Sequence, residues 1–302
     1  MRICVIFNPS ARGDKARRFR ALLHQISARA DLQETRAKGE AQRLAAAAVQ
    51  SGFDTLVAAG GDGTVHEVLN GMAEAPDGLT RTRLGVLPLG TVNVWARERQ
   101  LPVASEAAWS VILQNHEIRQ DLPWVEWDTT AGRVRRYFVQ LAGAGLDARA
   151  INLVSWRLKQ RIGSLAYIVA GLKALTHPAP LITVSGGPAP VEGRLVLLGN
   201  GRFYGGGFTI FPEANPHDGL LNARVFPRTD WVTLVRSGPT LLARKRLPAG
   251  VGRSEVAASF TLTAKGQVPF ELDGETAGEL PATFGLIPSA LRVLAPRPPA
   301  QG

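Results

Sequence analysis

The stretch LVAAGGDGTVHEVLNG, residues 56–71, decides how the rest of the chain is interpreted. It begins as a short apolar run, which is typical of a buried strand, and continues from Thr64 with helical spacing. The junction at 60–63 reads Gly-Gly-Asp-Gly. Glycines allow a loop to adopt positive φ and bring its N–H groups close to a ligand, and the following helix start carries partial positive charge. This strand, loop and helix together predict a phosphate-binding site.

The loop differs from two familiar phosphate-binding motifs. No lysine follows the glycines, which excludes a Walker A loop, and the spacing is not the G-x-G-x-x-G of dinucleotide-binding folds. Thr64 and Glu67 also form the T-x-x-E pattern of a helix capping box. The sequence therefore predicts a structural role for both residues, whatever the loop binds.

Strand and helix patterns alternate through the first part of the chain. The strand-like segments are 2–7, 31–37, 54–61 and 83–90, and the helix-like segments are 15–30, 39–52, 64–75 and 91–100. Repeated strand–helix units predict a doubly wound parallel sheet of the α/β class. Ligands bind such sheets beyond the carboxyl ends of the strands, which here are Asn8-Pro9, Gly60-Gly61 and Gly90-Thr91.

The second part of the chain has a different pattern. Short alternating segments with Gly and Pro between them predict antiparallel strands in a β-sandwich, and one helical pattern at about 151–176 interrupts them. We place an α/β nucleotide-binding domain at 1–127 and a β-rich domain for lipid and metal at 128–283. The last segment, about 284–296, is expected to return to the first domain.

The overall composition limits the classes of protein to consider. The chain has 302 residues and a formal net charge of +10, which predicts attraction to nucleic acid, an anionic membrane surface or a phosphorylated ligand. Cys4 is the single cysteine, so an intrachain disulfide is excluded. No apolar stretch reaches the ~18 residues that a membrane-spanning helix needs. We therefore expect a cytoplasmic protein.

Further short motifs accompany the opening stretch. They are Asn8-Pro9 with Gly13, T-x-x-x-G-E-A at 35–41, PLGTVNVWAR at 88–97, GAGLDA at 143–148, NGRFYGGGF at 200–208, PEANPHDGLL at 212–221 and LDGE at 272–275. In this order the set resembles the diacylglycerol kinase and sphingosine kinase catalytic-domain family, in particular its soluble bacterial lipid kinases. The resemblance covers nearly the whole chain. It implies an N-terminal Rossmann-like domain, similar to NAD kinase and phosphofructokinase, and a C-terminal antiparallel β-sandwich.

The family transfers the γ-phosphoryl group of ATP to a lipid hydroxyl, so the resemblance implies ATP and Mg²⁺ as cofactors. The general base would be Glu275 with Asp273 beside it, and Asp62 would join the network of Mg²⁺ and phosphate. The implied ATP-binding residues are Asn8, Pro9, Ser10, Ala11, Arg12, Thr35, Gly60, Gly61, Asp62, Gly63, Thr64, Val65, His66 and Thr91.

The resemblance also implies a second metal site. Asp218 would bind Mg²⁺ through its carboxylate, and Asn215 and Leu220 through their backbone carbonyls, with Asp121 linked through water. Both Asp-Gly pairs, at 218–219 and 273–274, are also ordinary turn signals. A turn without further function is the competing interpretation of each.

Two positions depart from the family pattern. Val94 stands where the family usually has Asp, and Glu40 replaces another usual Asp but keeps its charge. The missing carboxylate at Val94 favours an alternative, a nucleotide or lipid sensor with weak catalysis. An NAD kinase-like phosphotransferase is a second alternative, because NAD kinase also carries a GGDGT loop.

The expected partner is a lipid substrate that resembles diacylglycerol, phosphatidylglycerol or a sphingoid base. The positive charge predicts peripheral, electrostatic association with an anionic membrane surface. No nucleic acid partner is expected, because no recognised nucleic-acid motif accompanies the charge. A homodimer remains open.

Overall fold

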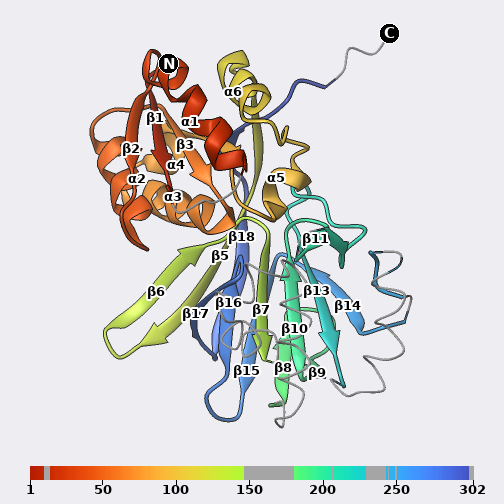
Figure 1. Ribbon diagram of the computed structural model, residues 1–302. Coiled ribbons are helices and arrows are strands. Elements are labelled where there is room, and N and C mark those ends of the chain that lie inside the picture. Colours follow the sequence, from red (N-terminus) through yellow and green to blue (C-terminus); the bar gives the residue numbers. More distant parts are fainter. Residues whose placement is uncertain are drawn as a thin grey trace. The chain divides into compact units, whose positions relative to one another are not determined.

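The computed structural model describes residues 1–9, 14–145, 180–205, 207–228, 243, 245–248 and 250–298. The chain divides into two compact units, the first formed by Met1–Gln120 with Ser289–Gly302 and the second by Asp121–Pro288 (Figure 1). The helix expected at about 151–176 lies outside the described residues.

The division does not fall where the sequence pattern places it. The sequence predicts a boundary near residue 128 and a return at about 284, whereas the units divide at Gln120 and at Ser289. Each division lies inside one continuous strand, β5 (Glu117–Thr129) or β18 (Ala282–Leu294). Because the chain shows no break in either strand, the pattern of apolar residues gives no signal at these points.

The first unit contains a parallel sheet in the order β2-β1-β3-β4-β18. The strands before β18 are β1 (Ile3–Phe7), β2 (Asp31–Glu34), β3 (Thr55–Gly60) and β4 (Arg83–Pro88). Every residue of β1 and β3 is buried, which explains their continuous apolar sequences. The parallel α/β fold predicted from the sequence is confirmed.

Helices cover both faces of this sheet (Figure 1). Phe19 and Ile26 of α1 and Trp109 of α6 join one apolar core with β1, β3 and β4. Helices α2 and α3 pack against the same strands on the other face, where Ile6 and Ala58 are buried. The helices are α1 (Asp14–Ser27), α2 (Glu40–Gln50), α3 (Asp62–Glu74), α4 (Gly78–Arg81), α5 (Val94–Glu98) and α6 (Ser105–Gln114).

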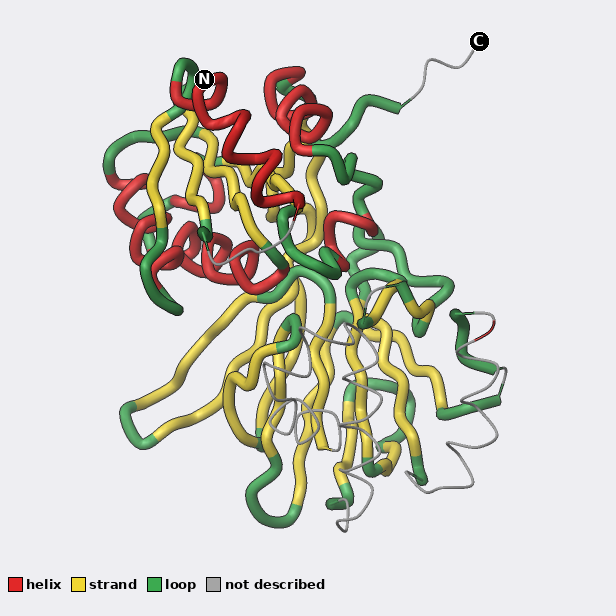
Figure 2. Tube along the Cα trace, in the orientation of Figure 1, coloured by secondary structure: helices red, strands yellow, loops and turns green. Residues whose placement is uncertain are grey.

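The described part of the second unit consists mainly of strands, drawn in yellow in Figure 2, and their pairing within this unit is antiparallel. One sheet has the order β14-β13-β10-β7-β16-β17, and a second group has the order β18-β15-β8-β9, with β5 pairing β18 and β6. Strands β11 and β12 form a separate pair. The bounds are β6 (Gly132–Tyr137), β7 (Leu141–Gly145), β8 (Ile182–Ser185), β9 (Val191–Gly193), β10 (Leu195–Gly199), β11 (Phe203–Tyr204), β12 (Phe208–Thr209), β13 (Leu221–Phe226), β14 (Arg253–Ala257), β15 (Ser259–Ala264), β16 (Pro269–Leu272) and β17 (Glu275–Glu279).

One apolar core joins the strands of the second unit. Alternate residues of both sheets point into it, as expected for a sandwich. At its centre Phe270 packs edge-on against Trp127 at a centroid distance of 5.2 Å and against Phe284 at 5.5 Å. These contacts confirm the antiparallel β-sandwich predicted for the second part of the chain. In the described part of the chain, no helix is long and apolar enough to span a membrane.

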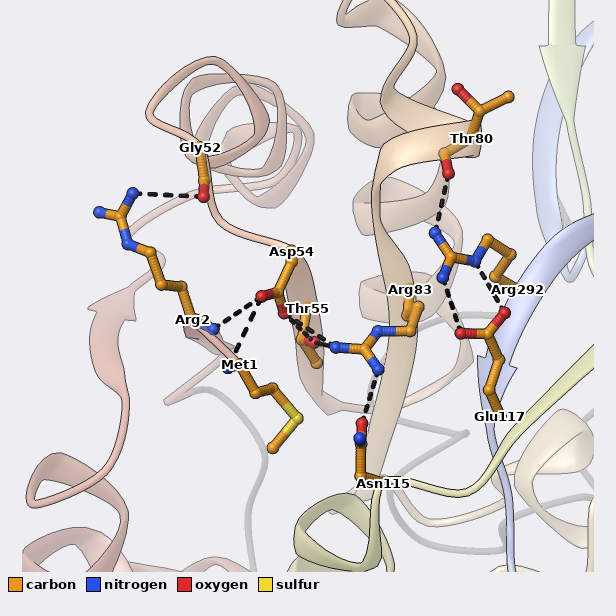
Figure 3. Close-up of polar contacts among 10 residues, drawn as sticks. All are labelled: Met1, Arg2, Gly52, Asp54, Thr55, Thr80, Arg83, Asn115, Glu117 and Arg292. Carbon is orange, nitrogen blue, oxygen red and sulfur yellow. Dashed lines mark hydrogen bonds and ion pairs between the residues drawn. The ribbon is translucent and has the colours of Figure 1, made fainter.

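Two groups of polar contacts lie near the amino ends of β1, β3, β4 and β5 and the carboxyl end of β18 (Figure 3). The Asp54 carboxylate accepts hydrogen bonds from the Arg2 backbone N–H and the Arg83 guanidinium, both at 2.9 Å. Arg292 of β18 donates two hydrogen bonds of 2.8 Å to the Glu117 carboxylate. Its third contact, also 2.8 Å, is to the carbonyl of Thr80. Arg292 therefore fixes the returning strand to the first unit.

We predict that Glu117→Gln destabilises the protein only above acidic pH. Hydrogen bonds from Arg292 lower the pKa of the Glu117 carboxyl below its ordinary 4.5, so its stabilisation is complete above that pH. It is lost as the pH falls through the lowered pKa. For this partly exposed pair the difference in unfolding free energy at pH 7 is about 1 kcal/mol. Denaturant unfolding at pH 7 and pH 3 measures it, and an equal difference at both pH values would contradict the assignment.

Candidate active site

The carboxyl ends of the parallel strands bring the predicted nucleotide-binding segments to one edge of the first unit's sheet. Phe7, at the end of β1, is opposite Glu34 and Ala59 in the neighbouring strands. Just beyond, Asn8 donates its backbone N–H to the Ala59 carbonyl at 3.0 Å, and Thr35 donates to the Phe7 carbonyl at 2.9 Å. The structure thus places Asn8, Thr35 and the glycine loop side by side, while their binding roles remain predictions.

The loops after β3 and β4 contact each other through main-chain atoms. The Gly60 carbonyl accepts hydrogen bonds from Leu89 N at 2.9 Å and Gly90 N at 3.2 Å. A Cβ atom on Gly90 would lie only 2.6 Å from the Cα of Gly61, so a side chain does not fit there. The Asn93 amide group holds the second loop closed by donating to the Gly90 carbonyl at 2.6 Å. The close approach of the loops therefore requires glycine at position 90, whereas a Cβ atom on Gly61 would make an ordinary contact of 3.5 Å with the Gly90 Cα.

Asp62 connects the glycine loop to α5. One oxygen of its carboxylate accepts the Val94 N–H at 3.1 Å and the other accepts the Trp95 N–H at 3.3 Å. Helix α5 begins at Val94 and has no side-chain cap of its own, since Asn93 bonds elsewhere. The acid predicted to join the Mg²⁺ and phosphate network thus also caps a helix.

The capping box predicted at Thr64 and Glu67 is wrong. Helix α3 already begins at Asp62, with Gly61 as its N-cap residue, so Thr64 lies inside the first turn. The Thr64 hydroxyl instead accepts a hydrogen bond of 3.4 Å from the Asn8 side chain. Glu67 points away from its own helix start and accepts the backbone N–H groups of Gly39 at 2.8 Å and Ala41 at 3.1 Å. Those groups belong to the beginning of α2.

The other predicted nucleotide residues differ in exposure. Thr35, Thr64, Val65 and His66 are buried, and Thr91 is exposed. Glycines 60, 61 and 63 line the start of α3. Ser10, Ala11 and Arg12 lie outside the described residues, whereas Pro9 is described as part of the turn after β1.

The loop of Glu40 is closed locally. The Glu40 carboxylate accepts the backbone N–H of Arg36, and this hydrogen bond lowers the pKa of the Glu40 carboxyl. Glu40 keeps the negative charge of the Asp that is usual at this position, and its carboxylate binds a backbone N–H group of its own loop.

In the second unit the Asp-Gly-Glu motif is a tight hairpin turn. Leu272 and Glu275 pair across it, and Asp273 and Gly274 both have positive φ, 50° and 89°. The Asp273 carboxylate accepts the N–H groups of Val139, Gln140 and Leu141 at 2.9, 2.9 and 3.1 Å. Asp273 therefore ties the turn to the start of β7. Glu275, the predicted base, is the first residue of β17 and is half-buried.

Glu271 is a further residue of this turn, one that no sequence motif singles out. Its side chain is fully buried, and its Oε2 accepts the Gly274 N–H at 2.6 Å. In the alternating sequence of β16 it occupies a position that is typically exposed on a half-buried sheet. Here a second apolar cluster, which contains Leu141, Leu197 and Phe226, covers that face of the sheet. The only sequence signal for a role of Glu271 in the turn is its position two residues before Asp273.

The loop at 215–220 gathers the predicted metal ligands in one turn. The Asp218 N–H approaches the Asn215 carbonyl at 3.4 Å, and the Asp218 carboxylate accepts the Leu220 N–H at 2.9 Å. The buried Asp121 holds the same turn by accepting the Gly219 N–H at 2.7 Å. Within the described residues, no group of three or more His, Cys, Asp or Glu side chains could hold a metal. The donor set here is one carboxylate and backbone carbonyls, all oxygens, which suits a hard cation.

Comparison with known proteins assigns both parts of the chain. Residues 2–125 match the model of the diacylglycerol kinase catalytic domain. Residues 140–295 match the model of the YegS C-terminal NAD kinase beta sandwich-like domain.

Individual relatives agree with these models. A diacylglycerol kinase of Staphylococcus carnosus is 30% identical over 87% of this chain and 83% of its own length. A probable lipid kinase YegS-like protein of Xanthomonas oryzae is 32% identical over 88% of this chain and 86% of its own length. A crystal structure of a diacylglycerol kinase from Bacillus anthracis has a TM-score of 0.76 at 21% identity, covers 98% of this chain and 97% of that one, and so shares the fold. The chain belongs to the bacterial family of lipid kinases that includes diacylglycerol kinase and YegS.

Proposed function

We propose that this kinase transfers the γ-phosphoryl group of ATP to a hydroxyl of a lipid that resembles diacylglycerol, phosphatidylglycerol or a sphingoid base. The observation that carries the proposal is the edge of the first unit's sheet. There Asn8 and Thr35 are joined to the ends of β3 and β1 by backbone hydrogen bonds, and the Asn8 side chain donates to the Thr64 hydroxyl of the glycine loop. Backbone N–H groups and a helix start are the groups that bind phosphates in many folds.

The reaction needs positioning more than covalent chemistry from the protein. The first unit would hold the nucleotide, with the glycine loop at its phosphates. Glu275 would accept the proton of the lipid hydroxyl as the new O–P bond forms and the bond to ADP breaks. Asp273 and Glu271 support this role, because both fix the backbone of the turn from which Glu275 projects.

Mg²⁺ fits two sets of residues in this chain. Asp62 offers a carboxylate at the glycine loop, and Asp218 with the carbonyls of Asn215 and Leu220 offers oxygens in the second unit. A bound Mg²⁺ would neutralise charge on the phosphates at the first place. At the second place it would stabilise the 215–220 turn, which Asp121 already holds through the Gly219 N–H.

The alternatives differ in what accepts the phosphoryl group. An NAD kinase-like enzyme would use the same first unit, but relatives of this chain include a diacylglycerol kinase and a probable lipid kinase YegS. A sensor would bind ATP without turnover. Val94 supports the sensor, since it brings no carboxylate to the start of α5. Binding of ATP by the wild-type protein with no transfer to any lipid would favour the sensor.

Glu275→Gln is expected to lower kcat by about 10²–10⁴-fold, the usual contribution of a general base. ATP binding should be largely unchanged, because Glu275 is not among the residues predicted to bind the nucleotide. The matched control is Glu279→Gln, which changes an exposed acid at the other end of the same strand. Near-normal turnover by the Glu275 variant, or equal loss in both variants, would remove Glu275 from the mechanism.

We also propose that the protein meets its substrate at an anionic membrane surface, to which its net charge of +10 would attract it. Each basic residue near such a surface contributes about 1 kcal/mol. Binding to phosphatidylglycerol-containing vesicles should therefore fall steeply as salt rises from about 50 to about 500 mM, measured by co-sedimentation. Equal binding to neutral phosphatidylcholine vesicles would contradict this mode of association.

A further inference from the structure

Glu67 has an unusual pair of partners for a residue in the middle of a helix. It lies in α3, in the turn after the glycine loop, and its two carboxylate oxygens accept N–H groups from a different helix. The donors, Gly39 and Ala41, are the N-cap and second residue of α2. Helix α2 has no side-chain cap from its own sequence. Glu67 therefore supplies from α3 the cap that α2 lacks.

The capped residues end a loop that begins in the predicted nucleotide site. The loop starts at Thr35, whose N–H is bound to the Phe7 carbonyl, and ends at Gly39, which has a φ of 83°. Glu40 closes it locally through the Arg36 N–H. Glu67 is the residue that joins its far end to the helix carrying the glycine loop. Two of the segments predicted to bind the nucleotide are thus connected through one carboxylate.

Contacts other than those of Glu67 also hold the two helices together. Helices α2 and α3 already pack closely at Gly71, where a Cβ atom would overlap the Gln42 carbonyl oxygen and approach the Ala45 Cβ at 2.7 Å. Glu74, two turns after Glu67 on α3, also accepts a hydrogen bond from the Gln42 side chain. What Glu67 adds is the fixed position of the loop before α2.

We propose that Glu67 is a positioning residue of the nucleotide site, which sets the 35–39 loop against the glycine loop. The inference rests on the proposed binding of ATP by the first unit. A carboxylate is well suited to this task, because it accepts two amides at once and carries negative charge at the positive end of α2. Its removal leaves the Gly39 and Ala41 amides without this partner and frees the loop to move.

The test compares Glu67→Ala with Glu74→Ala. Both changes remove an acid that connects α3 to α2, but only the first releases the loop. Glu67→Ala is expected to weaken ATP binding about tenfold, measured by equilibrium titration, as expected when a remote change misplaces binding groups. The KM for ATP should rise with it, while the KM for lipid stays unchanged. Glu74→Ala should bind ATP as the wild type does.

Two further measurements separate positioning from general damage. Glu67→Gln keeps one acceptor oxygen, so its ATP affinity should lie between those of wild type and Glu67→Ala. Hydrogen exchange should show faster exchange at Gly39 and Ala41 in Glu67→Ala, with melting temperatures of the two alanine variants alike. Wild-type affinity in Glu67→Ala, or equal loss in Glu74→Ala, would overturn the inference. Failure of the wild-type protein to bind ATP would instead overturn the proposed function.

Discussion

Acidic side chains that accept backbone N–H groups from other segments hold the loops of this protein in place. The clearest case is α3, where Asp62 caps the start of α5 and Glu67 caps the start of α2. The first N–H groups of a helix have no partner within the helix, and a carboxylate is a strong acceptor for them. Neither α2 nor α5 has a local side-chain cap. One helix thus fixes the starts of two others, and with them the loops after β2 and β4.

The second unit uses the same interaction in turns instead of helices. Asp273 accepts three consecutive N–H groups at the start of β7, and Glu271 accepts the N–H of Gly274. Asp121 does the same for the 215–220 turn. Most of these acids belong to motifs that were expected to act directly on ATP, metal or lipid. In the structure each of these acids accepts hydrogen bonds from backbone N–H groups. An acid among them that also acts on ATP, metal or lipid would therefore combine that role with holding a loop or turn in position.

The order of strands and helices could be predicted from the sequence because burial and periodicity are local signals. The runs at β1 and β3 are continuous and apolar, and the parallel sheet followed from their alternation with helices. The partners of acidic side chains could not be predicted in this way. Thr64 and Glu67 fit a local capping box, but Glu67 bonds residues more than two dozen positions away. Only the close packing of α2 on α3 brings those amides within reach. Glu271 was missed for the same reason, since its burial depends on a cluster from other strands.

The central claim is that this chain moves the terminal phosphoryl group of ATP to a lipid. The most direct measurement incubates the protein with [γ-³²P]ATP, Mg²⁺, extracted bacterial lipids and NAD in one reaction, and identifies each labelled product by mass. We expect label in a lipid as a new phosphate monoester and none in NAD. Label in NAD alone, or no labelled product with any acceptor, would contradict it.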